Sequence, residues 1–216
     1  MRSQIISIVF LSTLFLGSVL FQTGCATTGN QRSAKTRTTM KAVEQDYIQT
    51  IKQVDATNKS LEVLVDTNKS DKKKAFEKYS SNVNKMKNLE KRLFEHADKM
   101  GTQQKNYFEE WRMQGNTYTN PQIQALSEQR RADLSAVFAQ IAEASVGVNG
   151  SLKAYMSDIG QIRTYLSTDL TPKGIESITP TSQQAIMDGN HLKDAVNPVL
   201  AAIGNARDEL AQGDNK

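Results

Sequence analysis

Apolar residues along most of this chain recur at alternating spacings of three and four, the pattern of helices that pack in a coiled-coil manner. In residues 38–68, every seventh position is apolar, at Met40, Tyr47, Val54 and Leu61. No stretch alternates between apolar and polar residues over the length that a β-strand needs. The pattern therefore predicts an all-α fold.

Three further segments continue this periodicity. Residues 71–114 carry a seven-residue series of Tyr79, Met86, Leu93, Met100 and Tyr107. Residues 121–167 have an apolar stripe that runs from Ile123 and Leu126 to Leu166, and Asn120 before Pro121 is typical of a helix start. The last segment, residues 171–210, contains internal prolines. They predict a break at Pro180 and a kink at Pro198.

Short breaks near residues 68–71 and 115–120 make consecutive helices antiparallel neighbours. Helices of about 45 residues would reach roughly 65 Å at 1.5 Å per residue. We therefore expect residues 38–216 to form one elongated, antiparallel up-down bundle of about four long helices with coiled-coil-like packing.

The first 24 residues have the pattern of a signal peptide. Arg2 precedes an apolar run over residues 5–21, and a polar QTG tripeptide follows before Cys25. This stretch resembles the lipobox of bacterial lipoproteins, in which a small residue precedes a cysteine that receives diacylglycerol. Gly24 fits that pattern, whereas Gln22 departs from it because an aliphatic residue is usual there. An uncleaved signal anchor, or an ordinary signal peptide with an incidental cysteine, are the alternatives.

Lipidation of Cys25 would also use up the only thiol in an exported chain. Two or three acyl chains, palmitate among them, would anchor the protein stably in a membrane. Residues 25–37 are polar and aperiodic, and we expect them to form the lipidated N-terminus and a flexible tether. Ala26 after the cysteine favours, by resemblance to Gram-negative lipoproteins, the outer membrane with the protein facing the periplasm.

The net charge of +4 is concentrated at the N-terminus. Five of the 27 basic residues precede the first acidic residue, which leaves 22 basic against 23 acidic residues in the rest of the chain. A nucleic-acid-binding protein would place its basic residues on the folded body. The sequence thus argues against a nucleic-acid partner and favours a membrane partner through the anchor.

The residues needed for catalysis or metal binding do not cluster in the sequence. Neither His96 nor His191 has a second histidine or a cysteine at metal-ligand spacing. Helix pairing about residue 70 places Glu44 level with His96, a contact we interpret as structural. Phosphate-binding loops and nucleophile elbows are also missing. We therefore predict no catalytic residue, no metal site and no cofactor, and expect a protein that is not an enzyme.

Three other features have both a structural and a functional interpretation. Asn58, Glu90, Gln104 and Arg130 interrupt the core stripes; pairing places Asn58 near Asn82, and Gln104 near Arg130. Such residues either fix helix register or are only partly buried.

The small residues of 139–160 allow tight packing, a hinge or a cleft. The aromatics near the second turn either form a contact patch or cap the core: Tyr107, Phe108, Trp111 and Tyr118.

Several short motifs resemble a known family. They are FEEW at residues 108–111, the Tyr118/Asn120 pair, SEQRRADL at 127–134, YLSTDL at 165–170 and GIES at 174–177. They look like segments of domain of unknown function 2959, a family of bacterial, mostly helical, exported proteins. The resemblance would cover about residues 38–212, and it departs most clearly after Thr179. It implies a helical envelope protein and supplies no activity.

The sequence leaves two functions open. The first is a non-enzymatic, membrane-tethered lipoprotein of the cell envelope that acts as an interaction or spacer module and binds an envelope protein through its helical faces. The second is a bundle that binds a lipid or another apolar ligand between loosened third and fourth helices. Self-association through the heptad faces also stays open, because a heptad stripe does not say whether its partner lies in the same chain.

Overall fold

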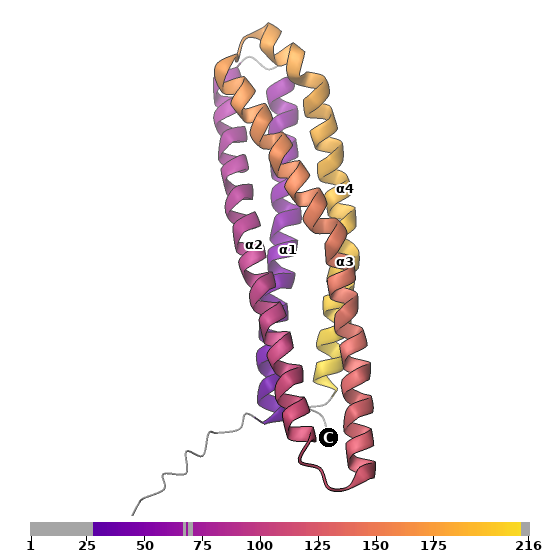
Figure 1. Cartoon of the computed structure of the whole chain (residues 1–216). Helices are drawn as coiled ribbons and strands as arrows, with labels where there is room; N and C mark the ends of the chain where they lie inside the picture. The colour runs from indigo at the N-terminus through magenta and orange to yellow at the C-terminus, as the bar shows by residue number, and fades with distance from the viewer. Residues whose placement is uncertain (1–27, 67, 69–70, 213–216) are drawn as a thin grey trace, which may run out of the picture.

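The protein is a bundle of four long antiparallel helices (Figure 1). The computed structural model describes residues 28–66, 68 and 71–212. Helix α1 spans Gly29–Val65, α2 Lys72–Gly115, α3 Pro121–Thr168 and α4 Pro172–Ala211. Each helix packs against its neighbours in the chain, and α4 closes the ring by packing against α1. The predicted all-α up-down bundle is confirmed.

The heptad stripes form the core. The predicted α1 series of Met40, Tyr47, Val54 and Leu61 is buried, with exposed fractions of at most 2%. All five members of the α2 series are buried as well. On α3 the stripe is buried from Leu134 onward except for the half-buried Val137 and Ala144, and α4 completes the core with residues such as Val196 and Ile203. The core therefore runs along the bundle, as hydrophobic periodicity predicted.

Side chains at the helix starts supply the backbone partners that a first turn lacks. Asn120 accepts hydrogen bonds from the amides of Gln122 and Ile123, and Pro121 occupies the first helical position, as predicted. Thr171 caps α4 in the same way through the amide of Gly174. These caps define the starts of α3 and α4, where the two short connections end.

Helix α1 starts at Gly29, so the prediction of a flexible tether over residues 25–37 is wrong from residue 29 onward. Thr28 and Gln31 form a capping box, in which each side chain accepts a hydrogen bond from the other residue's backbone amide. Ser33 then donates to the carbonyl oxygen of Leu210 on α4 at 3.0 Å. Tertiary contacts thus hold a polar segment in the helix that apolar periodicity could not reveal.

Helix α4 is continuous from Pro172 to Ala211, so the predicted break at Pro180 is also wrong. Both Pro180 and Pro198 lie inside the helix. Figure 1 shows the first turns of α4 lying across the far end of the bundle before the helix runs back along α3. A proline lacks the amide proton and crowds the preceding turn, which bends a helix without ending it when tertiary packing supports both sides.

The helices differ in length, and this shapes one end of the bundle. Helices α2 and α3 have 44 and 48 residues, whereas α1 and α4 have 37 and 40. The connection between α2 and α3 projects beyond the start of α1 and the end of α4 (Figure 1). We call this the N-terminal end of the bundle, because α1 begins there.

Candidate functional site

A pocket of about 440 Å³ lies at the N-terminal end of the bundle, and all four helices contribute to it. Its lining residues are Gly29, Asn30, Arg32, Ser33, Tyr107, Trp111, Gln114, Tyr118, Arg130, Leu134, Glu209 and Leu210. The pocket lies where the core ends, because Leu134 and Tyr107 are the last buried residues of their stripes in this direction. It therefore joins the start of α1 to the projecting α2–α3 connection.

Polar contacts between helices surround this pocket. Arg32 donates from Nη2 to Oε1 of Gln114 at 2.8 Å and lies 3.9 Å from the carboxylate of Glu110. Arg130 donates to both the side chain and the backbone carbonyl of Glu209, at 2.9 and 3.0 Å. These contacts tie α1 to α2 and α3 to α4. The guanidinium groups of Arg32 and Arg130 thus hold the helices together at this end of the bundle. Their geometry does not favour an anion-binding site.

The predicted aromatic cluster mainly caps the core. The ring of Tyr107 makes edge-to-face contacts with Phe108 and Trp111, and Phe108 makes another with Phe138. Trp111 also donates its indole proton to Oγ of Ser127 at 2.9 Å across the α2–α3 connection. Tyr107 is 7% exposed. These aromatic contacts fix how α3 leaves the turn.

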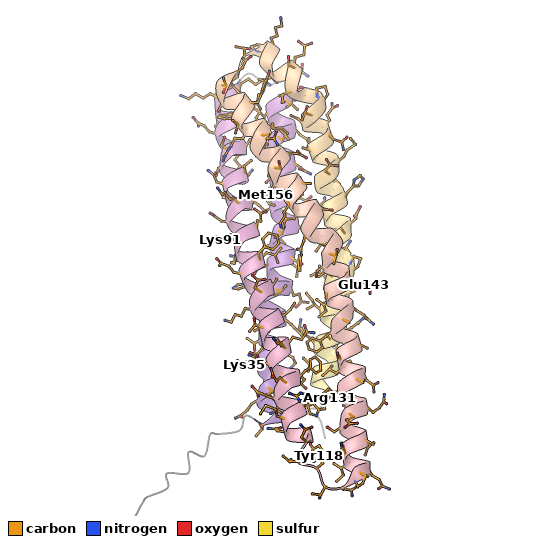
Figure 2. All side chains as sticks on the ribbon, viewed as in Figure 1. Lys35, Lys91, Tyr118, Arg131, Glu143 and Met156 are labelled. Carbon is orange, nitrogen blue, oxygen red and sulfur yellow. The ribbon has the colours of Figure 1, made fainter. Side chains whose placement is uncertain are left out.

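Beyond this cap the α2–α3 connection exposes apolar side chains. Ile123 and Leu126 are 49% and 72% exposed, so the prediction that they belong to the core stripe of α3 is wrong. The reason is that α1 and α4 end before reaching their level, so no helix is available to cover them. Met113 in the last turn of α2 and Tyr118 in the α2–α3 connection are exposed as well, and Figure 2 shows Tyr118 at this extreme end of the bundle. We call these four residues the tip.

The contact predicted between Glu44 and His96 is not formed. His96 instead bonds through Nδ1 to Asp46 at 2.5 Å, while Arg92 donates to the other oxygen of Asp46 at 2.7 Å. Glu44 pairs with Arg207 of α4. Two residues along a helix correspond to a rotation of about 200°. Asp46 therefore faces α2, whereas Glu44 faces α4. The cluster joins α1 to α2, in keeping with a structural role.

Asn58 and Asn82 lie at the same level, as predicted, but they do not bond to each other. Asn82 donates to the carbonyl oxygen of Ala56 and to Ser60, both on α1. Asn58 points away from α2 and donates to the carbonyl oxygen of Ile186 on α4 at 3.1 Å. Each amide therefore bridges two helices, but they do so at different faces of α1.

Tyr155 completes the polar group around Asn58 by donating to its Oδ1 at 2.8 Å. Burial raises the pKa of the Tyr155 hydroxyl well above its ordinary value, against the opposing effect of a hydrogen bond with Thr57. The hydroxyl stays protonated and acts as a donor. This group links α1, α3 and α4 inside the core.

The other polar interruptions of the core stripes lie at its edge. Glu90, Gln104 and Arg130 are half-buried. Burial raises the pKa of the Glu90 carboxyl, while nearby Lys153 and Lys87 act in the opposite direction. The predicted proximity of Gln104 to Arg130 has no counterpart among the described hydrogen bonds, in which Arg130 binds Glu209. Partial exposure, one of the two interpretations left open, describes these three residues.

The small residues of 139–160 border a pocket between α3 and α4. This pocket of about 400 Å³ is lined by Gln140, Glu143, Ala144, Pro198, Ala201, Ala202 and Asn205. Gly147 and Gly150 lie on the outer surface of α3, and no neighbouring atom lies within 4 Å of a Cβ built on either residue. The glycine that permits a close approach is Gly189 on α4, where a Cβ would lie 2.7 Å from Nδ2 of Asn58. The predicted ligand site between α3 and α4 stays a prediction.

Among residues 28–66, 68 and 71–212, no three His, Cys, Asp or Glu side chains are grouped in a way that could hold a metal ion. Within the same residues, each helix falls short of the length of apolar sequence that crossing a membrane requires. Cys25 and the predicted signal peptide over residues 1–24 lie outside the described residues.

No protein-family model, curated protein or solved structure matches this chain. The resemblance to domain of unknown function 2959 therefore stays a prediction. Its motifs nevertheless have physical roles in the bundle. Trp111 and Ser127 bond across the α2–α3 connection, Asn120 caps α3, and Asp169 accepts from Thr171 at the start of α4.

Proposed function

We propose that this protein is an exported bacterial lipoprotein whose helical bundle acts as a rigid interaction or spacer module at a membrane surface of the cell envelope. One observation carries the proposal. The bundle begins at Gly29, only four residues after Cys25, and Arg32 and Ser33 tie that first turn to α2 and α4. An anchor on Cys25 would therefore act on the folded bundle almost directly.

The short connection limits how far the bundle can stand from the anchor. Four residues reach at most about 14 Å when fully extended. Helix α3, with 48 residues, extends over about 72 Å. A lipid on Cys25 would thus hold one defined end of a long rod close to the membrane, which suits a spacer or a module that presents its side faces.

The location and the partners form the finer part of the proposal. Ala26 after the cysteine supports the outer membrane, with the bundle facing the periplasm. Long faces on all four helices remain accessible for an envelope protein, and Figure 2 shows charged side chains such as Lys91 and Glu143 along them. The proposal assigns no catalytic step to the bundle, since Asp46, Glu44 and Tyr155 take part in contacts between helices.

The anchor is tested by metabolic labelling with a clickable palmitate analogue. The wild-type chain should be labelled and a Cys25→Ser variant should not. Gln22→Leu restores the usual aliphatic residue and should raise the labelled fraction without changing the site. Equal labelling of the wild type and Cys25→Ser would refute the lipoprotein assignment.

The module is tested by photocrosslinking in intact cells. A photoreactive residue at Lys91 samples α2, and one at Glu143 samples α3. We expect one of these faces to capture the same envelope protein reproducibly and the other face not to capture it. Captures that vary between replicates at both positions would contradict an interaction module.

A further inference from the structure

The tip of the bundle combines exposed apolar side chains with an absence of charge. Nine large hydrophobic residues are exposed among the described residues, and four of them are the tip residues Met113, Tyr118, Ile123 and Leu126. The other five are spread along α1, α3 and α4. Ile123 and Leu126 are three residues apart on a helix and therefore share one face. The tip is thus a concentrated apolar surface.

Residues 113–127 contain no Asp, Glu, Lys or Arg, although such residues make up 23% of the chain. The opposite end of the bundle differs. Its α1–α2 connection is flanked by Asp66, Asp71 and three successive lysines from Lys72, and its α3–α4 connection contains Asp169. Arg112 and Glu128 flank residues 113–127, but the projecting segment between them carries no charge. The connections at the other end contain charged residues themselves.

The uncharged segment projects from the end of the bundle where α1 starts. The pocket that contains Gly29 also contains Tyr118, so the first turn of α1 and the tip belong to one end. Arg130 marks the level at which α4 ends, because it binds Glu209. The nine residues of α3 from Pro121 up to Arg130 project past that level by about 14 Å.

The chain between Cys25 and Gly29 reaches at most about 14 Å, which is enough to bring Cys25 to the level of the tip. An acylated Cys25 would lie at the membrane surface, and the tip would then reach the same depth. Exposed Leu, Ile and Met beside a Tyr are the side chains that enter the boundary between headgroups and acyl chains. Charged side chains would resist this transfer, and the tip has none.

From this arrangement we propose that the tip is a lipid-contacting surface that seats the bundle upright on the bilayer in which Cys25 is anchored. The inference rests on the proposed lipoprotein function and adds a second point of contact with the membrane. Two contacts at one end fix the orientation of the rod, whereas a single anchor would let it swivel. The contact is apolar and does not depend on anionic lipid.

The test uses the full-length protein, matured in its host, purified and reconstituted in vesicles. An environment-sensitive fluorophore is placed on Leu126→Cys or Met113→Cys, and on Val146→Cys as the matched control. Val146 is 74% exposed on the same helix as Leu126 and lies about 30 Å further along it. Because the chain has one natural cysteine, acylation of Cys25 leaves the introduced thiol as the only one that reacts.

We expect brominated phosphatidylcholine to lower the fluorescence at positions 126 and 113 by roughly twofold, and to leave position 146 unchanged. Replacing a third of the lipid with phosphatidylglycerol should not alter this result. Equal, unquenched fluorescence at 126 and 146 would overturn the proposal. A probe at 126 that is shielded from water but not quenched by brominated lipid would also overturn it, because a protein would then cover the tip.

Mass spectrometry of the same samples separates the two proposals. An unmodified Cys25 would refute the lipoprotein function and the seated tip together. An acylated Cys25 with a water-exposed tip would refute only the seating. An acylated Cys25 with quenched probes at both tip positions would support both.

Discussion

Tyr155 on α3 donates its phenolic proton to Oδ1 of Asn58 on α1, and the two oxygens are 2.8 Å apart. Both residues are buried, at 0% and 5% exposure. Asn58 also donates to the carbonyl oxygen of Ile186 on α4. The pair therefore connects three helices through the core and fixes their axial offset more sharply than apolar side chains alone would.

Removing the Tyr155 hydroxyl should destabilise the bundle. In Tyr155→Phe the Oδ1 of Asn58 keeps its burial but loses its donor, which should lower the free energy of unfolding by about 1–3 kcal/mol. Urea denaturation followed by circular dichroism measures the change. Tyr165→Phe is the control, since Tyr165 is 38% exposed on the same helix, and it should change the stability by less than about 0.5 kcal/mol. Equal effects would show that the hydrogen bond contributes nothing specific.

Replacing a glycine in a helix with alanine usually stabilises the fold. Replacing Gly189 should instead destabilise it. A Cβ at this position would lie 2.7 Å from Nδ2 of Asn58 and 2.8 Å from Cε2 of Tyr155. We expect Gly189→Ala to cost about 1–3 kcal/mol through overpacking. Gly150→Ala on the open face of α3 should instead stabilise by up to about 1 kcal/mol. Thermal unfolding of the two variants gives the signs directly, and a stabilising Gly189→Ala would contradict the close packing.

Alkaline pH should unfold the bundle through its buried tyrosines. Burial raises the pKa of the Tyr79 and Tyr155 hydroxyls well above their ordinary value. In the unfolded chain these groups ionise near pH 10. Above that pH the folded chain binds more protons, so its stability falls as pH rises, by about 1.4 kcal/mol per pH unit for each tyrosine.

The Tyr79→Phe variant isolates this effect from the titration of lysines. Tyr79 donates to the carbonyl oxygen of Ile159 at 2.7 Å, so the variant begins less stable at pH 8. Between pH 10 and 12, however, its stability should decline less steeply than that of the wild type, by about 1.4 kcal/mol per pH unit. Parallel declines in urea titrations would mean that Tyr79 ionises equally in the folded and unfolded chains.

The first turns of α1 should depend on Arg32. Its guanidinium bonds to Gln114 and lies next to Glu110, which joins α1 to the end of α2. In Arg32→Ala we expect amide hydrogen exchange over residues 29–37 to accelerate by about tenfold or more, while the middle of α1 keeps its protection. Lys35→Ala is the control on an exposed neighbour. Unchanged exchange in Arg32→Ala would show that the capping box alone holds this segment.

Much of the fold could be predicted because heptad periodicity is a local property of the chain. The spacing of Tyr79, Met86 and Leu93 identifies the buried face of α2 without reference to any other helix. The cap formed by Asn120 and Pro121 likewise depends on adjacent residues alone. The starts of α2 and α3 and most of the core were predictable for this reason.

The N-terminal end of the bundle was harder to predict, because its features depend on where neighbouring helices stop. Ile123 and Leu126 continue the stripe of α3 in sequence, yet they are exposed because α1 and α4 do not extend to their level. Conversely, Arg32 and Ser33 lack apolar periodicity but are buried against α2 and α4. The absence of charged residues from 113–127 was visible in the sequence and could have indicated the tip.

The sequence by itself determined four helices, their antiparallel order, the buried stripes and the position of Cys25 ahead of the bundle. The tertiary structure decided which polar groups meet. His96 contacts Asp46 instead of the predicted Glu44. Asn58 bonds with Tyr155 and not with Asn82. The physical reason is that a heptad pattern fixes which face of a helix is buried, but neither its axial offset nor the identity of the helix that a given flank faces.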